Sequence, residues 1–198
     1  MYDLQDNRWV KNSNQIKPTE KKVVLTFDDG PSRSLTAILD ILKEKDVKAI
    51  FFWQSRLVHK QRPWKRVLLE GHKIGSHAQN HKNLVKLCNE QQYQQIKGSV
   101  EKINNMTGAQ VQFFRPPFGQ YNEYTMSVLK ELQLVPMLWE ISSFDWELKH
   151  NPDKIICNVV NHLMDGSVIL LHELEQTVAI LPQLIDKIRE HGYEFTVI

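Results

Sequence analysis

Short apolar runs alternate with helical patterns along most of this chain, and that alternation is the strongest constraint on its fold. Between the runs, apolar residues recur at the helical period, as at Ile155, Ile156 and Val159. Repeated strand–helix units predict an α/β fold with a parallel sheet, either closed as a barrel or doubly wound. The predicted strands cover residues 22–27, 48–53, 72–75, 111–114, 135–141, 168–171 and 193–197.

Polar residues mark where the predicted helices begin. Asn89, Asn122 and Asn151 each precede a helical pattern, and asparagine is a favoured N-cap residue. Pro152 follows Asn151 directly, and proline is well suited to the first position of a helix. We therefore expect helices to begin at these three points.

The totals fit one globular domain, because 198 residues with 41% hydrophobic content can bury a sizeable core. Residues 1–20 are polar and aperiodic, so we expect an N-terminal surface arm, anchored by Trp9, ahead of a domain over residues 21–198. Cys88 and Cys157 form no CxxC pair, and we expect two buried thiols, with one disulfide as the alternative.

Charge and hydropathy argue against two classes of partner. The net charge is +2 and no basic stripe is present, so we expect no nucleic-acid partner. No run approaches the ~20 apolar residues of a transmembrane helix. The chain as given begins without an apolar leader segment.

Several chemistry-bearing residues fall at the ends of predicted strands. Because the carboxyl ends of parallel strands share one rim, these side chains can converge on one site, whereas polar residues placed at random would lie at both ends. They are Asp28 and Asp29, His77, Arg115, Asp145 and His172.

The adjacent carboxylates Asp28 and Asp29 would repel each other if both faced one site, and their pKa values would be driven apart. A metal ion resolves this conflict if one Asp ligates it and the other stays free as a base. His77 and His81 are four residues apart, which on a helical turn places their Cβ atoms about 5–6 Å apart. Together with Asp29 they would bind a divalent ion. A solvated turn and two unrelated histidines are the alternatives, and His72 lies within a strand rather than after it.

The remaining rim residues suit proton transfer. His172 could act as a general acid, with Asp145 holding its ring, and Arg115 could pair with Asp28 and keep it ionised. Phe118 and Trp146 could form the wall of a pocket. The alternatives are a core histidine, a surface ion pair and ordinary core aromatics.

The order of these motifs resembles the polysaccharide deacetylase family, also called the NodB-homology domain or carbohydrate esterase family 4. The resemblance covers residues 22–198. The motifs that carry it are Thr26-Phe27-Asp28-Asp29-Gly30-Pro31, Ser76-His77-x3-His81, Arg115-Pro116-Pro117-Phe118-Gly119, Phe144-Asp145-Trp146 and Leu170-Leu171-His172.

This resemblance implies a distorted (β/α)7-type barrel that removes acetyl groups from N-acetylated amino sugars of a glycan such as peptidoglycan or chitin. It implies that Asp29, His77 and His81 bind one divalent metal ion, zinc first, with cobalt, nickel or manganese as alternatives. Asp28 would be the base, oriented by Arg115. The Phe118 N–H would hold the oxyanion. Asp145 would tune the acid His172, and Trp146 and Leu170 would line the acetyl pocket.

One motif departs from the family pattern. Ser142 stands where the fourth motif usually has its first Asp, so we expect substrate contacts or loop order to differ. We expect a monomer. From the substrate class we expect a location outside a bacterial cell or on its surface, with a cytoplasmic location left open. A hydrolase of small amides and a glycan-binding module without catalysis are the competing hypotheses.

Overall fold

A computed structural model describes residues 5–18 and 20–198 of the chain. Within them, all strands form a single sheet whose order is β5-β4-β3-β2-β1-β7-β6, with β8 paired to β1, and every strand pair is parallel. The strands are β1 (Lys22–Gly30), β2 (Ala49–Trp53), β3 (Lys73–Ser76), β4 (Phe113–Phe114), β5 (Val135–Pro136), β6 (Ile141–Ser142), β7 (Val168–His172) and β8 (Glu194–Phe195).

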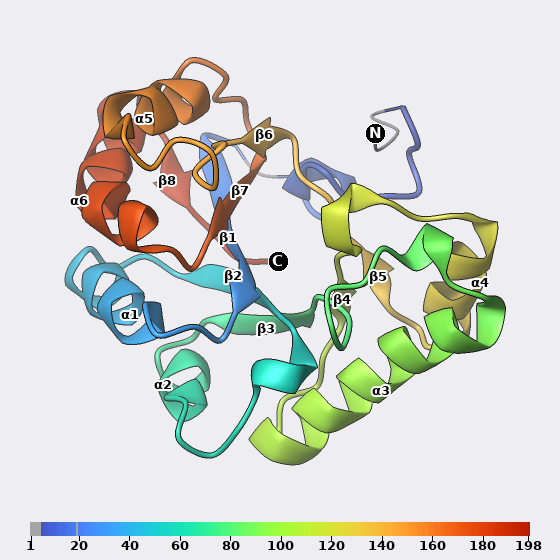
Figure 1. Cartoon of the computed structure of the whole chain (residues 1–198). Coiled ribbons are helices and arrows are strands. Elements are labelled where there is room, and N and C mark those ends of the chain that lie inside the picture. The colour runs from blue at the N-terminus through green and yellow to red at the C-terminus, as the bar shows by residue number, and fades with distance from the viewer. Residues whose placement is uncertain (1–4, 19) are drawn as a thin grey trace.

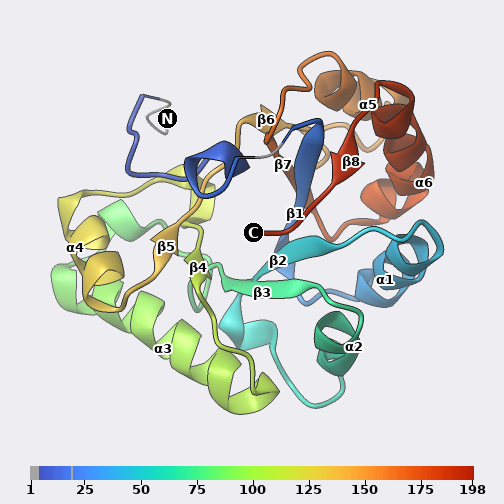
Figure 2. The same cartoon turned by 180° about the vertical axis from the view of Figure 1, so that it is seen from behind.

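Helices surround the curled sheet (Figure 1, Figure 2). The helices on the side of β1, β2 and β7 are α1 (Leu35–Glu44), α5 (Pro152–Val160) and α6 (Glu175–Glu190), whereas α2 (Trp64–Leu69) packs beside β3. The long α3 (Asn89–Thr107) and α4 (Glu123–Glu131) lie on the side of β4 and β5. The prediction of a distorted barrel of parallel strands is confirmed.

The single strand predicted over residues 135–141 is wrong. The structure has β5 and β6 there, at opposite edges of the sheet, and residues 137–140 cross from one edge to the other. The apolar run reads as one strand because Met137, Leu138 and Trp139 are all buried. Their burial comes from closing the barrel rather than from a continuous ladder.

The N-terminal segment is built into this closure. Val10 N donates to the Pro136 carbonyl oxygen at 2.9 Å, and Leu138 N donates to the Val10 carbonyl oxygen at 2.9 Å. Trp9 is fully buried, with its ring 4.5 Å from that of Tyr121. Trp9 therefore is an anchor, as expected. The boundary of the arm at residue 20 stays a prediction, and residues 1–4 and 19 lie outside the described residues.

The helix starts follow the sequence at two of three asparagines. The side chains of Asn122 and Asn151 each accept a bond from the helix backbone, at Thr125 N and Lys154 N. In α3 the N-cap is Cys88, and Asn89 is the first helical residue.

The prediction of buried thiols is also wrong, because Cys88 and Cys157 are both exposed and free.

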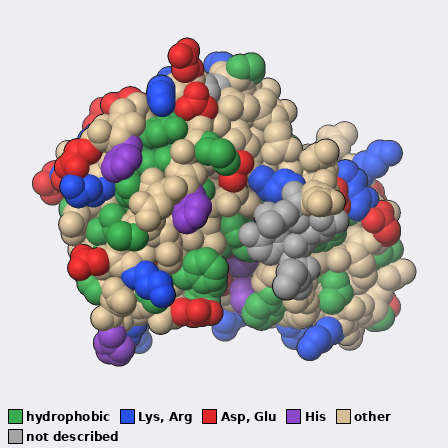
Figure 3. Space-filling view, turned by 90° about the horizontal axis from the view of Figure 1, so that it is seen from above, with side chains coloured by type: hydrophobic (Ala, Val, Ile, Leu, Met, Phe, Trp, Pro, Cys, Tyr) green, Lys and Arg blue, Asp and Glu red, His purple; other side chains and the backbone are tan. Residues whose placement is uncertain are grey.

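Surface features agree with the charge pattern. On the face shown in Figure 3, acidic and basic side chains are interspersed rather than gathered by sign. Among the described residues, no helix is both long and apolar enough to cross a bilayer.

We predict that Trp9→Ala lowers the free energy of unfolding by about 3 kcal/mol, because it leaves a cavity at the closure of the barrel. Urea denaturation followed by circular dichroism measures this change. The matched control is Leu69→Ala, which truncates a side chain that is 85% exposed and should change stability by less than about 0.5 kcal/mol. Equal stability of the two variants would contradict the anchoring role.

Candidate active site

The rim residues lie together at the carboxyl end of the sheet. Asp28 and Asp29 lie within β1, which runs to Gly30 rather than ending at Phe27 as predicted, and Asp28 still pairs with His172 of β7. His77 follows β3 and Arg115 follows β4 directly. The parallel arrangement of the strands is what gathers these side chains.

Backbone geometry turns both carboxylates toward one site. Successive side chains of a regular strand point to opposite faces, which would separate Asp28 from Asp29. Asp29 instead has φ of 66°, in the left-handed region, and the pairing of β1 with β2 shifts register between Phe27 and Gly30. Aspartate is among the few residues that tolerate this conformation.

Arg115 holds Asp28 from the interior. Its guanidinium is fully buried, and Nη1 donates to Asp28 Oδ1 at 2.7 Å and to Thr26 Oγ1 at 2.8 Å. Burial lowers the pKa of Arg115, and the adjacent Asp28 carboxylate opposes that shift. Asp28 Oδ2 is left facing His77, 3.7 Å from Nε2. One oxygen of Asp28 is thus fixed while the other points into the site.

Asp29, His77 and His81 converge so that one ligand atom from each lies within 4.8 Å of the others. Asp29 Oδ1 is 3.7 Å from His77 Nε2 and 3.3 Å from His81 Nε2. The two histidines do not share a helical turn, which corrects the sequence expectation. They lie in an irregular loop after β3, where Ala78 and His81 have positive φ.

This cluster fits a divalent metal ion. His77 Nδ1 lies 2.8 Å from the Arg115 carbonyl oxygen, which can only accept, so Nδ1 donates there and the neutral ring carries its lone pair on Nε2, which faces the cluster. Burial lowers the pKa of His81 and favours its neutral, ligating form. Burial raises the pKa of Asp29, but His77 and His81 outweigh that effect and the net shift is downward. Two neutral imidazoles and one carboxylate form a donor set that zinc accepts.

His172 is held by a buried carboxylate. Its Nδ1 lies 2.7 Å from Asp145 Oδ1, and Asp145 Oδ2 accepts from His172 N at 2.7 Å and from Thr177 Oγ1 at 2.6 Å. Burial lowers the pKa of His172, but its bond to Asp145 and the charge of that carboxylate give a net increase. In the protonated ring, Nε2 can donate while Asp145 holds Nδ1.

Aromatic side chains flank the rim. Phe118 is 56% exposed and its ring meets that of His81 at 4.6 Å, while Trp146 meets His172 at 5.0 Å. Phe144 packs 5.2 Å from Trp146. Leu170 is buried in β7. Phe118 and Trp146 are thus exposed beside the two halves of the site rather than part of the core.

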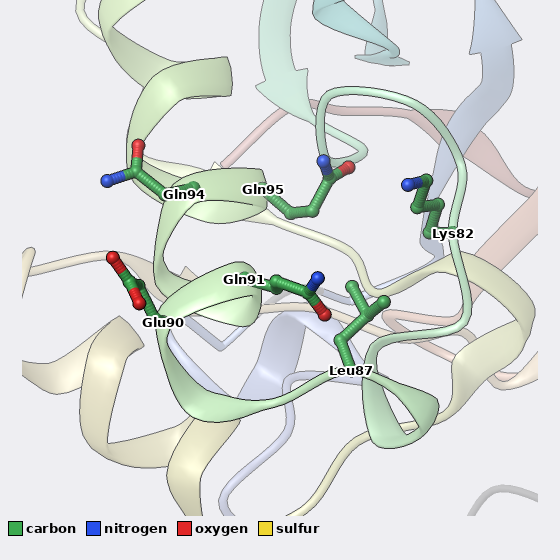
Figure 4. Close-up of a pocket in the computed structure, with 6 residues that line it drawn as sticks. All are labelled: Lys82, Leu87, Glu90, Gln91, Gln94 and Gln95. Carbon is green, nitrogen blue, oxygen red and sulfur yellow. The ribbon is translucent and has the colours of Figure 1, made fainter.

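A polar pocket of about 240 Å³ lies beside the His81 loop (Figure 4). Lys82 and Leu87 of the loop face the first turns of α3 across it. Its lining is Lys82, Leu87, Glu90, Gln91, Gln94 and Gln95, none of which belongs to the metal-binding cluster. The pocket adjoins that cluster through the chain, because Lys82 follows His81.

His72 stands apart from the site. It is buried at the opposite end of β3, where its Nδ1 accepts from Ala49 N at 3.1 Å and burial lowers its pKa to about 4.

Sequence reasoning missed three supporting residues. Thr26 bonds Arg115, Thr177 bonds Asp145, and Gln54 Nε2 donates to Asp29 Oδ1 at 2.8 Å. Gln54 directly follows β2, so the strand-end rule could have found it.

Comparison with known proteins identifies the family. A sequence profile of the polysaccharide deacetylases matches residues 15–137. The chain belongs to the polysaccharide deacetylase family. Members of this family depend on a metal ion, in agreement with the cluster of Asp29, His77 and His81.

Relatives of this family member include peptidoglycan deacetylases. The peptidoglycan-N-acetylglucosamine deacetylase PgdA of Listeria monocytogenes is 36% identical over 91% of this chain and 38% of its own length. The chain thus spans less than half of that relative.

Two solved structures share the fold. The Bc1960 peptidoglycan N-acetylglucosamine deacetylase has a TM-score of 0.86 at 31% identity, over 96% of this chain and 90% of that one. A family pseudoenzyme of Bacillus anthracis, BA3943, has a TM-score of 0.83 at 28% identity, over 90% of this chain and 64% of that one. The fold therefore occurs with and without activity, so catalysis depends on the side chains that each member carries.

We predict that Asp145→Asn lowers the pKa of His172, because the carboxylate that favours the imidazolium is lost while burial remains. NMR titration of the His172 ring protons should place the wild-type pKa above the ordinary 6.5 and the variant below the wild type. The raised pKa also stabilises the fold at pH below 6.5, and that contribution is lost as pH rises through the folded value. An unchanged His172 pKa in the variant would contradict the coupling.

Proposed function

We propose that this chain is a metal-dependent N-deacetylase that hydrolyses the acetamido group of an amino sugar in a polysaccharide. The observation that carries the proposal is the pairing of two opposed proton-transfer groups around one metal-binding cluster. Asp28 offers a free carboxylate oxygen beside His77, and His172 offers Nε2 from the neighbouring strand. A glycan-binding surface would need neither.

We infer that Asp29, His77 and His81 would hold the ion, with zinc proposed first. A divalent ion bound there would supply Lewis acidity for an amide carbonyl and for water. Asp28 Oδ2 takes the proton of the attacking water as the new C–O bond forms. The Phe118 backbone N–H donates to the developing oxyanion, as such donors do in acyl transfer.

His172 completes the reaction by delivering the proton on Nε2 to the leaving nitrogen as the C–N bond breaks. The products are acetate and a free amine. Asp145 supports this step because it raises the pKa of His172 and keeps the ring protonated. Trp146 and Leu170 are proposed to line the acetyl pocket, and the exposed Phe118 to contact the sugar.

Peptidoglycan N-acetylglucosamine is the proposed substrate, with chitin-type oligosaccharides as the second choice. Support comes from the names of the relatives, since PgdA and Bc1960 are both peptidoglycan N-acetylglucosamine deacetylases. Action at the bacterial cell wall, outside the cell, follows from that substrate. Acetate release from peptidoglycan and from chitin oligomers, with and without a chelator, distinguishes the two polymers. It also separates both from a hydrolase of small amides, which would act on neither.

We predict that Asp28→Asn abolishes acetate release, by at least about 100-fold, while zinc binding changes little, because the base lies outside the ligand set. Acetate release and zinc titration by calorimetry measure the two effects. Near-normal turnover in Asp28→Asn would remove Asp28 as the base.

We predict that His77→Ala, unlike Asp28→Asn, loses zinc affinity together with activity, because one of three ligands is gone. His72→Ala is the matched control, since His72 is a buried histidine away from the cluster and its loss should leave zinc affinity unchanged. Full zinc occupancy of His77→Ala would exclude His77 as a ligand.

A further inference from the structure

Glu173 is a buried acid that the reaction above does not use. It directly follows His172 and is 3% exposed, and the positive charge of Arg62 favours its ionised form. Burial raises its pKa to about 7. Placing a carboxyl group in such surroundings is costly unless its oxygens find donors, so its bonds indicate its role.

Both carboxyl oxygens of Glu173 accept hydrogen bonds from N–H donors. Oε2 accepts from Ser32 N at 2.6 Å, and Oε1 accepts from Trp53 Nε1 at 2.8 Å. Its backbone takes part as well, because Glu173 N donates to the Asp28 carbonyl oxygen at 3.2 Å and Ser32 Oγ donates to the Glu173 carbonyl oxygen at 2.9 Å. One residue at the end of β7 thus binds the ends of both β1 and β2.

Gly30 supplies the space that this side chain occupies. A β-carbon built on Gly30 would overlap the Glu173 carboxyl group and would also press on the Trp53 ring. The φ of Gly30 is not among the positive values, so space rather than backbone conformation requires glycine here. The glycine that follows Asp28 and Asp29 and the acid that follows His172 therefore fit each other.

The segments that Glu173 joins are those that carry the reacting groups. Asp28 and Asp29 lie immediately before Gly30, and His172 lies immediately before Glu173. The Trp53 carbonyl oxygen accepts from His77 N at 2.8 Å, and the next residue, Gln54, donates to Asp29. Displacement of Glu173 would therefore move the proposed base Asp28, the proposed acid His172, and the proposed metal ligands next to Gly30 and Trp53.

We propose that Glu173 is a positioning residue that fixes Asp28 and Asp29 relative to His77 and His172. The activity readout of this proposal rests on the proposed deacetylation, whereas its zinc-binding and double-mutant readouts do not.

The test is Glu173→Gln, which keeps the shape but replaces one acceptor with an NH₂ group. Because both oxygens accept from N–H donors, the amide must turn its NH₂ toward Ser32 N or Trp53 Nε1, and one bond is lost. We expect zinc affinity and kcat each to fall by about 10- to 100-fold with KM little changed, as for partners of metal ligands. Glu44→Gln on the exposed face of α1 is the matched control.

A second variant separates positioning from general destabilisation. Trp53→Phe removes the Nε1 donor, so the NH₂ of the introduced glutamine can face residue 53 while its oxygen accepts from Ser32 N. Glu173→Gln should therefore cost at least about 5-fold less zinc affinity in the Trp53→Phe background than in the wild type, a coupling that a double-mutant cycle measures. Thermal unfolding of all four proteins checks that each is folded.

Wild-type zinc affinity and kcat in Glu173→Gln would overturn the proposal. An equal loss of zinc affinity on Glu173→Gln in the wild-type and Trp53→Phe backgrounds would also overturn it. That result would show that the hydrogen bonds accepted by the two Glu173 oxygens do not affect the metal site. If the wild-type chain released no acetate from any glycan, the proposed function would fail, while the zinc affinities of the cycle would still decide the role of Glu173.

Discussion

The buried guanidinium of Arg115 is the contact on which the rest of the structure depends. It donates to Asp28 and Thr26 of β1, and Nη2 donates to the Leu138 carbonyl oxygen at 2.6 Å in the segment that crosses between the edges of the sheet. An unpaired charge at this depth would be strongly destabilising. The guanidinium that orients the candidate base is therefore the same group that binds the segment crossing between the sheet edges, so a change at Arg115 affects both stability and site geometry.

Two neighbouring carboxylates acquire different roles through their surroundings. The Asp28 side chain is 3% exposed and pairs with Arg115, whereas the Asp29 side chain is 38% exposed and lies between two imidazoles. The left-handed backbone at Asp29 brings both to one face, where a regular strand would separate them. On the other side of β1, the register of β7 sets His172 opposite Asp28. Backbone geometry thus places the candidate acid and the candidate base around one cluster.

The ends of the predicted strands are the most informative feature of the sequence for locating the site. Parallel strands place their carboxyl ends on one rim regardless of the conformation of the loops. That rule finds Asp28, Asp29, His77, Arg115 and His172, and it also points to Gln54. The spacing argument for His77 and His81 is wrong, because a spacing of four fits a helix whereas the two residues lie in an irregular loop. Proximity of the two rings came from positive φ angles that no spacing encodes. Exposure of Cys88 and Cys157 was likewise set by helix packing rather than by residue type.

The order of elements and the residue types at the strand ends are local properties of the chain, since they follow from apolar periodicity and short-range preferences. Their period and position therefore reveal a parallel α/β sheet with a rim of acids, histidines and an arginine. Long-range contacts decided what those residues do. Three features depend on residues far apart in the chain. They are the division of residues 135–141 between two strands, the burial of Trp9 against the crossing segment and the contact of Glu173 with Gly30. Such contacts form only in the folded barrel, because folding brings the sheet edges and the strand ends close together in space.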